Sequence, residues 1–119
     1  MDSDYSNKRD LERVIQEYVP GKQVTLAHTI ANPAADLCQK VGVDHSEAIG
    51  ILNMTPGESA IIAGDVAIKA ANVELGFLDR FSGAIVLTGS IGAVDASLES
   101  VLSALDQVLG FNVCKRTRS

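Results

Sequence analysis

The sequence predicts an α/β fold, a sandwich with helices over a mainly antiparallel sheet. Residues 23–31 alternate apolar and polar side chains, as a half-buried strand does. Residues 91–109 carry apolar side chains at spacings of three and four, as an amphipathic helix does. Two largely apolar runs, at residues 73–80 and 82–89, meet at a short turn and predict a β-hairpin. One domain of 119 residues accommodates all of these elements.

The N-terminal region is expected to stand apart from this domain. Residues 1–12 are mostly polar and are expected to form a flexible segment. Residues 13–18 alternate imperfectly, so their pattern leaves helix and strand both open. Pro20 and Gly21 then give a turn signal, which separates this region from the first clear strand.

That strand, residues 23–31, is expected to lead into a short helix. His28 is predicted to share one strand face with Val24, Leu26 and Ile30, as a packed, hydrogen-bonded histidine and not a metal ligand. Asn32 as the N-cap and Pro33 at the first helical position predict where the helix begins. Gly42 predicts its end.

A strand at residues 48–54 is expected next, followed by a second helix. Thr55 as N-cap, Pro56 and Glu58 read as a capping box. The helix carries small side chains at spacings of three and four, a stripe suited to packing against a sheet or a neighbouring subunit. The stripe consists of Ala60, Ala63 or Gly64, Ala67 and Ala71.

The last helix is expected to begin after Ser90, whose side chain is a good N-cap, and to end near Gly110. A final short strand is expected at residues 111–117. The predicted apolar positions of the helix are Ile91, Val94, Leu98, Val101, Leu102, Leu105, Val108 and Leu109.

The turn of the predicted hairpin contains more charged, aromatic and polar side chains than a tight turn requires. Asp79, Arg80, Phe81 and Ser82 stand together where Asn-Gly or Asp-Gly would suffice. The simplest interpretation is an ion pair between Asp79 and Arg80 across the hairpin. A functional tip is the alternative.

Composition argues against several classes of function. The net charge of -5 and the lack of a basic, aromatic-rich stripe argue against nucleic-acid binding. No segment has the length and apolarity of a membrane span or signal peptide, so a soluble cytoplasmic protein is expected. Cys38 and Cys114 lack the spacing of a redox or zinc pair, and both are expected to be reduced. No catalytic, metal-binding or cofactor-binding motif is present, so none of these sites is expected.

Two weaker signals remain. Ser90 to Val94 follow a strand and open a helix, so their backbone N–H groups could receive an anionic metabolite in a small regulatory α/β domain. Asp65 and Lys69 lie four residues apart and predict an exposed ion pair, although Lys69 could instead reach across a subunit boundary.

Three stretches resemble one family closely: "IQEYVPGKQVTLAHTIANP", "AIGILNMTPGESAIIAGDVAIKAANVELGFLDRFSGAIVLTG" and "GAV". They are similar to the circularly permuted shell proteins of bacterial microcompartments, of the type found in ethanolamine, propanediol and choline utilisation operons. The resemblance covers about residues 14–118. It implies one permuted shell domain over residues 13–119, in a structural subunit without enzymatic activity, located in a microcompartment in the cytoplasm.

The resemblance also implies partners and sites. The chain would form a cyclic homohexamer that packs edge to edge with other shell proteins around encapsulated enzymes. Arg80, Phe81, Ser82 and Gly83 would line the central pore, and Lys69 would lie at the hexamer edge, as would Asn32, where ordinary shell proteins carry an arginine. Six copies of residues 13–18 would form an axial barrel, which resolves the open choice for this segment in favour of strand; these residues are Arg13, Val14, Ile15, Gln16, Glu17 and Tyr18.

Overall fold

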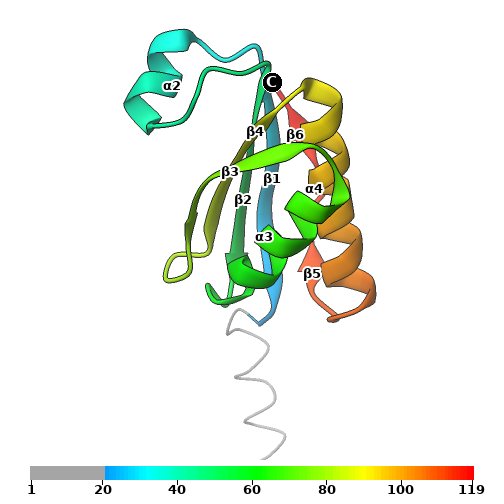
Figure 1. Cartoon of the computed structure of the whole chain (residues 1–119). Coiled ribbons are helices and arrows are strands. Elements are labelled where there is room, and N and C mark those ends of the chain that lie inside the picture. The colour runs from blue at the N-terminus through cyan, green and yellow to red at the C-terminus, as the bar shows by residue number, and fades with distance from the viewer. Residues whose placement is uncertain (1–20) are drawn as a thin grey trace, which may run out of the picture.

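The computed structural model describes residues 21–119, and the described chain is a single sheet with two helices packed on one face (Figure 1). A short third helix, α2, lies at one end of the sheet. The predicted order of strand, helix, strand, helix, hairpin and helix is confirmed. The elements are β1 (Gln23–Ala31), α2 (Ala35–Val41), β2 (Ala48–Thr55), α3 (Ser59–Ala70), β3 (Val73–Asp79), β4 (Ala84–Gly89), α4 (Ile91–Gln107), β5 (Asn112–Val113) and β6 (Thr117–Arg118).

The sheet is mainly antiparallel, as predicted. Its strand order is β3-β4-β2-β1-β5, and β6 also pairs with β1. The pairs β1–β2, β2–β4 and β3–β4 are antiparallel, whereas β5 and β6 run parallel to β1. The prediction of one continuous final strand at residues 111–117 is therefore wrong in detail. The C-terminal segment pairs with β1 twice, through β5 and through β6, and the residues between these two strands are unpaired.

The main core lies between the sheet and the pair α3 and α4. On α3 the small side chains Ala60, Ala63 and Ala67 are fully buried, which lets α3 pack closely within its own subunit. The alternative prediction, that this stripe contacts a neighbouring subunit, is thus wrong for these three residues. The buried Ser97 of α4 donates a hydrogen bond from Oγ to the Ala67 carbonyl at 2.9 Å, which joins the two helices.

Helices α2 and α3 both begin later in the chain than predicted. Thr55 is still part of β2, paired with Gln23, so it cannot cap α3, and Glu58 makes no side-chain capping bond. Asn32 adopts a left-handed backbone conformation with φ 52°, and α2 begins at Ala35 without a side-chain cap. The predicted capping box and the predicted Asn32 cap are therefore wrong. The predicted end of α2 at Gly42 is confirmed, with φ 90°.

The faces of β1 also differ from the prediction, because the pairing with β2 shifts register between Val24 and Leu26. Beyond this irregularity, Ala27 and Thr29 are buried beneath the helices with Val24. His28 therefore does not share a face with Val24. Its hydrogen bonds are confirmed, since its ring nitrogens lie 2.6 Å from Thr117 Oγ1 and 2.7 Å from Ser119 Oγ.

Helix α4 follows its predicted pattern closely. The Ser90 side chain accepts a hydrogen bond from the Ala93 N–H at 3.1 Å, which confirms the predicted cap. Gly110 adopts the left-handed conformation with φ 71° just beyond the helix. Val108 is the exception among the predicted apolar positions. The helix ends one residue earlier, at Gln107, and the Val108 side chain is 77% exposed.

The second face of the sheet is only partly covered. Beneath α2, a small cluster contains Cys38, Ile49 and Val86, and Cys38 is a buried free thiol. Leu26 and Phe77 remain exposed on this face, which we call the open sheet face. No helix within residues 21–119 is long and apolar enough to cross a lipid bilayer.

Candidate functional site

The tip of the hairpin, residues 79–83, projects at the end of β3 and β4 (Figure 1). Asp79 and Ala84 are the last paired residues of the two strands. The Gly83 N–H donates to the Asp79 carbonyl at 2.8 Å and closes the turn. The tip is thus a compact turn on a rigid two-stranded base.

Asp79 organises the tip from within. Its Oδ1 accepts a hydrogen bond from the Phe81 N–H at 2.9 Å, and its Oδ2 accepts one from Ser82 Oγ at 2.9 Å. The Phe81 N–H and the Ser82 hydroxyl stabilise the charged carboxylate, so the pKa of Asp79 is lowered from its usual value. Among the described residues Asp79 forms no ion pair with Arg80, so the simpler interpretation of the turn is wrong.

Two glycines hold the tip against the turn between β2 and α3. Gly83 has φ 81°, and a Cβ at this position would lie 2.0 Å from the Met54 carbonyl oxygen. A Cβ on Gly57 would lie 2.4 Å from the Arg80 carbonyl oxygen. Both distances are far below van der Waals contact, so only glycine fits at these two positions.

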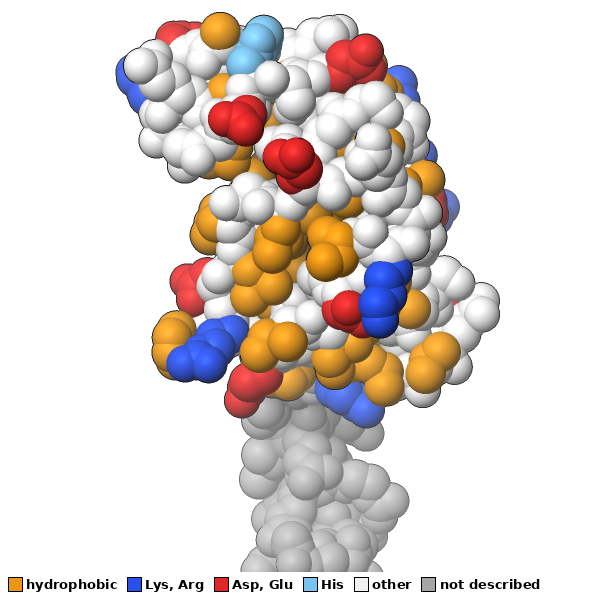
Figure 2. All heavy atoms as spheres, viewed as in Figure 1, with side chains coloured by type: hydrophobic (Ala, Val, Ile, Leu, Met, Phe, Trp, Pro, Cys, Tyr) orange, Lys and Arg blue, Asp and Glu red, His pale blue; other side chains and the backbone are white. Residues whose placement is uncertain are grey.

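The side chains of the tip point outward. Phe81 is 83% exposed, and the Arg80 guanidinium lies 5.0 Å from the centre of its ring, within the range of a cation–π contact. Figure 2 shows a hydrophobic and a basic side chain projecting together at the tip of the hairpin. Arg80, Phe81 and Ser82 therefore present a cation, an aromatic ring and a hydroxyl on one turn, whereas Gly83 is buried.

Of the two predicted edge residues, Lys69 is in the predicted ion pair. Its Nζ lies 2.9 Å from Asp65 Oδ2, and both side chains are largely exposed. Asn32 is exposed, and its backbone N–H donates to the Glu47 carbonyl at 2.7 Å. The predicted barrel residues 13–18 lie outside the described residues.

The predicted anion site at Ser90–Val94 is taken by the chain's own side chains. Glu47 Oε1 accepts a hydrogen bond from the Ile91 N–H at 3.1 Å, and Ser90 Oγ accepts one from the Ala93 N–H. A carboxylate thus already occupies the positive end of the helix. The proposal of a regulatory anion-binding domain is not supported.

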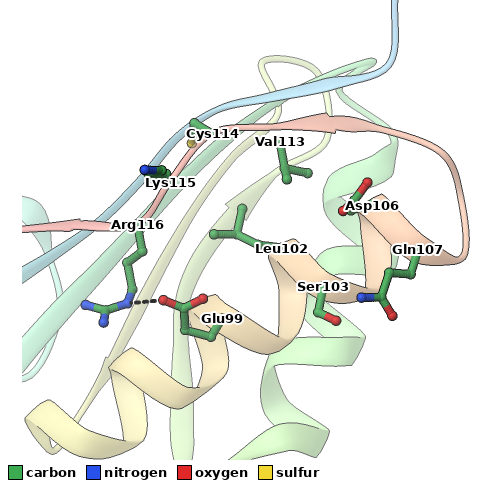
Figure 3. Close-up of a pocket in the computed structure, with 9 residues that line it drawn as sticks. All are labelled: Glu99, Leu102, Ser103, Asp106, Gln107, Val113, Cys114, Lys115 and Arg116. Atoms are coloured by element: carbon green, nitrogen blue, oxygen red, sulfur yellow. Dashed lines mark hydrogen bonds and ion pairs between the residues drawn. The ribbon is translucent and has the colours of Figure 1, made fainter.

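A polar hollow lies between α4 and the C-terminal arm, residues 112–119. Figure 3 shows Arg116 of the arm extending toward Glu99 of α4, with Nε to Oε2 at 2.9 Å. Arg116 and Arg118 also bind Asp95, which accepts a further hydrogen bond from Thr29 at 2.7 Å. These contacts fasten the arm to the helix. Residues 21–119 contain no group of three or more histidine, cysteine, aspartate or glutamate side chains suited to a metal ion.

Sequence inspection missed the roles of two residues that hold the tip, Asp79 and Gly57. The role of Asp79 as an acceptor could have been found from its position, because aspartate at the start of a turn often binds the N–H two residues on. Gly57 gave no such signal, since its contact partners lie more than twenty residues away in the chain.

Comparison with known proteins identifies a family. Residues 48–117 match the family model described as BMC domain. The chain is 57% identical over 110 residues to the bacterial microcompartment shell protein EutS of Escherichia coli K12, covering 92% of this chain and 99% of that one. It is 56% identical over 109 residues to PduU, a microcompartment shell protein of Salmonella typhimurium, covering 91% and 94%. A solved structure of CutR as a flat hexamer superposes with a TM-score of 0.82 at 48% identity, covering 87% and 96%.

Proposed function

This chain belongs to the BMC-domain family of bacterial microcompartment shell proteins, and on that premise we propose that it forms cyclic homohexamers with the hairpin tip at the central axis. It is a structural subunit of a microcompartment shell, which lies in the cytoplasm of the cell. The observation that carries the proposal is the rigid tip with three exposed polar and aromatic side chains.

Two separate apolar surfaces support the hexamer. Ile61, Ile62 and Ile68 of α3 are about half exposed on the helical side of the sheet. Leu26 and Phe77 are exposed on the open sheet face, on the other side. Cyclic assembly requires a heterologous interface, in which one patch of a subunit meets a different patch of the next. Figure 2 shows hydrophobic side chains gathered over α3 and β3.

At the axis of such a hexamer, six copies of Arg80, Phe81 and Ser82 would surround the opening. Six guanidinium groups near one axis attract anions and repel cations, and the aromatic rings narrow the passage. The internal hydrogen bonds of Asp79 favour one fixed shape for each tip. We infer that the tip sets the charge and the width of the pore.

Residues 13–119 form the proposed permuted domain, and residues 13–18 of six subunits form the proposed axial barrel. Lys69 and Asn32 are the proposed edge residues, which would meet other shell proteins. We propose no catalytic role for this chain, because its relatives are shell proteins.

The native mass of the purified chain tests the hexamer. Six chains of 12.5 kDa give a particle of about 75 kDa, which is expected to persist on dilution. Native mass spectrometry and light scattering at two concentrations measure this directly. A stable monomer or dimer would exclude a sixfold axis and therefore the proposed pore.

The edge proposal is tested by a pair of variants. Lys69→Ala is expected to retain the hexamer but to weaken its assembly into sheets, as seen by electron microscopy. The pair with Asp65 contributes only about 0.3–0.5 kcal/mol to stability, because it is exposed. Asp65→Asn is the matched control, since it breaks the same pair and keeps Lys69. Normal sheets from Lys69→Ala, or equal defects in both variants, would show that Lys69 makes no edge contact.

A further inference from the structure

A second pocket lies at the end of the hairpin opposite the tip. It has a volume of about 310 Å³, which is in the range of small-molecule sites. The loop after α2 meets the start of β3 and the end of β4 here. The residues that line it are Asp44, His45, Ser46, Asn72, Glu74, Thr88, Gly89 and Ser90.

The charges of this pocket are negative. Asp44 and Glu74 bring two carboxylates, and the lining includes neither lysine nor arginine. Within residues 21–119 neither carboxylate takes part in an ion pair. Glu47 differs from both, because its carboxylate is already engaged by the Ile91 N–H. In Figure 2, acidic side chains lie on the surface between α2 and the start of β3, with no basic side chain beside them.

A buried hydroxyl group in the pocket, that of Thr88, is a second and independent indication of a ligand. Thr88 is only 5% exposed and pairs with Glu74 in the β3–β4 register, so both lie on the same side of the sheet. The Thr88 hydroxyl makes no hydrogen bond with any residue in the part of the chain described, 21–119. A buried hydroxyl without a partner is costly, and in a native structure it is commonly satisfied by a water molecule or a ligand.

We propose that this pocket binds a small organic cation, an ammonium compound that also carries a neutral hydrogen-bonding group such as a hydroxyl. The carboxylates of Asp44 and Glu74 would receive the ammonium group through charge-assisted hydrogen bonds. The Thr88 hydroxyl and the Asn72 amide would bind the neutral group. This inference goes beyond the shell function and does not depend on the position of the pore.

Ligand-observed NMR with the purified full-length assembly tests the proposal, with 3-aminopropanol as the probe. Saturation transfer to this amine is expected at millimolar concentrations. 1,3-Propanediol has the same number of heavy atoms without the charge, and it is expected to show no transfer. Equal transfer to both compounds, or none to the amine, would overturn the proposal, as would displacement of the amine by equimolar Mg²⁺, which would indicate a metal site.

Variants locate the binding. Glu74→Gln and Asp44→Asn are each expected to weaken binding about tenfold, because each removes one charge-assisted contact. Thr88→Val keeps the side-chain shape and is expected to weaken binding less. Asp106→Asn, which changes an exposed carboxylate of the hollow beside α4, is the control and is expected to bind normally. Asp44 lies on an exposed loop, so its variant is expected to fold even if Glu74→Gln does not. Unchanged binding by Asp44→Asn would overturn the assignment.

Discussion

The hairpin tip and the C-terminal arm are both short surface segments, but they are held in different ways. The tip is fixed by backbone contacts and by one carboxylate that bonds within the same turn. The arm is fixed by side-chain charges, chiefly Arg116 and Arg118 on Asp95. Steric fit does not depend on salt or pH, whereas ion pairs do. The two segments should therefore lose their attachment to the rest of the subunit under different conditions.

The largest expected effect is at Gly83, where steric fit is tightest. Gly83→Ala would force a side chain into a left-handed backbone position and against the Met54 carbonyl. We expect a loss of about 3 kcal/mol in the free energy of unfolding, measured by urea denaturation. Gly92→Ala is the control, because nothing lies within 4 Å of a Cβ there, and it should be neutral or slightly stabilising. Equal stability of both variants would mean that the tip can shift away from β2 at little cost.

The second effect is at Asp95, which anchors the arm and has a side chain only 19% exposed. Asp95→Asn should cost about 2 kcal/mol at low salt, because it weakens bonds to Arg116, Arg118 and Thr29. The loss should shrink at high salt, in contrast to Gly83→Ala. Glu99→Gln, at a more exposed partner of Arg116, is the control and should cost less than 1 kcal/mol. A salt-independent loss would show that charge does not hold the arm.

Asp95 also predicts how stability depends on pH. Burial raises the pKa of Asp95, but the Thr29 hydroxyl and the two arginines outweigh it, so the pKa is lowered overall. A carboxyl with a lowered pKa in the folded state stabilises the fold above its unfolded pKa of about 3.9 and loses this contribution as the pH falls. Asp95→Asn should therefore show a flatter loss of stability below about pH 4 than the parent chain.

The third effect is at Asp79, and it should be local. The pKa of Asp79 is also lowered, by the Phe81 N–H and the Ser82 hydroxyl, so its bonds are lost only as the pH falls below the usual range of an aspartate. Asp79→Asn should speed amide hydrogen exchange at Phe81 while the rest of β3 and β4 exchanges as before. Unchanged exchange at Phe81 would show that the backbone alone holds the turn.

The smallest effect on stability is expected at Phe81, whose side chain makes few contacts in the subunit. Phe81→Ala should change the free energy of unfolding by no more than about 0.5 kcal/mol. In the proposed hexamer it should nevertheless widen the axial opening, and a cryo-electron microscopy structure of the variant hexamer would measure its width. Val108→Ala, just beyond the end of α4, is the control, because it also removes part of a largely exposed apolar side chain and lies outside the surfaces proposed for the hexamer. An axial opening of the same width in Phe81→Ala and the parent would place the tip away from the pore.

The sequence predicted those parts of the fold that depend on local pattern. Helix α4 is long and strongly periodic, so its cap at Ser90 and most of its buried face were correct. The starts of α2 and α3 were wrong because pairing between strands, such as Gln23 with Thr55, overrode local capping signals. The prediction that His28 shares a face with Val24 was wrong because a register shift in the β1–β2 pair cannot be read from one strand alone.

In the candidate site, too, local sequence pattern predicted some features, whereas contacts between distant segments were missed. The unusual composition of the turn at residues 79–82 marked the tip in advance. The contact of Gly57 with the Arg80 and Phe81 carbonyls joins segments that are distant in sequence, and pattern alone gave no access to it. Charge placement at Glu47 also escaped notice, although it decides against anion binding at Ser90–Val94.

The positions of the two ends of the described chain have a practical consequence for protein engineering. Residue 21 and Ser119 lie at opposite ends of the sheet (Figure 1). Ser119 is paired through its backbone with Thr29 and Ala31, so a peptide fused after it would leave from a fixed point beside β1. A label at Gly21 and a label at Ser119 would lie at opposite ends of the sheet, and two-colour labelling of the same subunit could report its orientation in a shell wall.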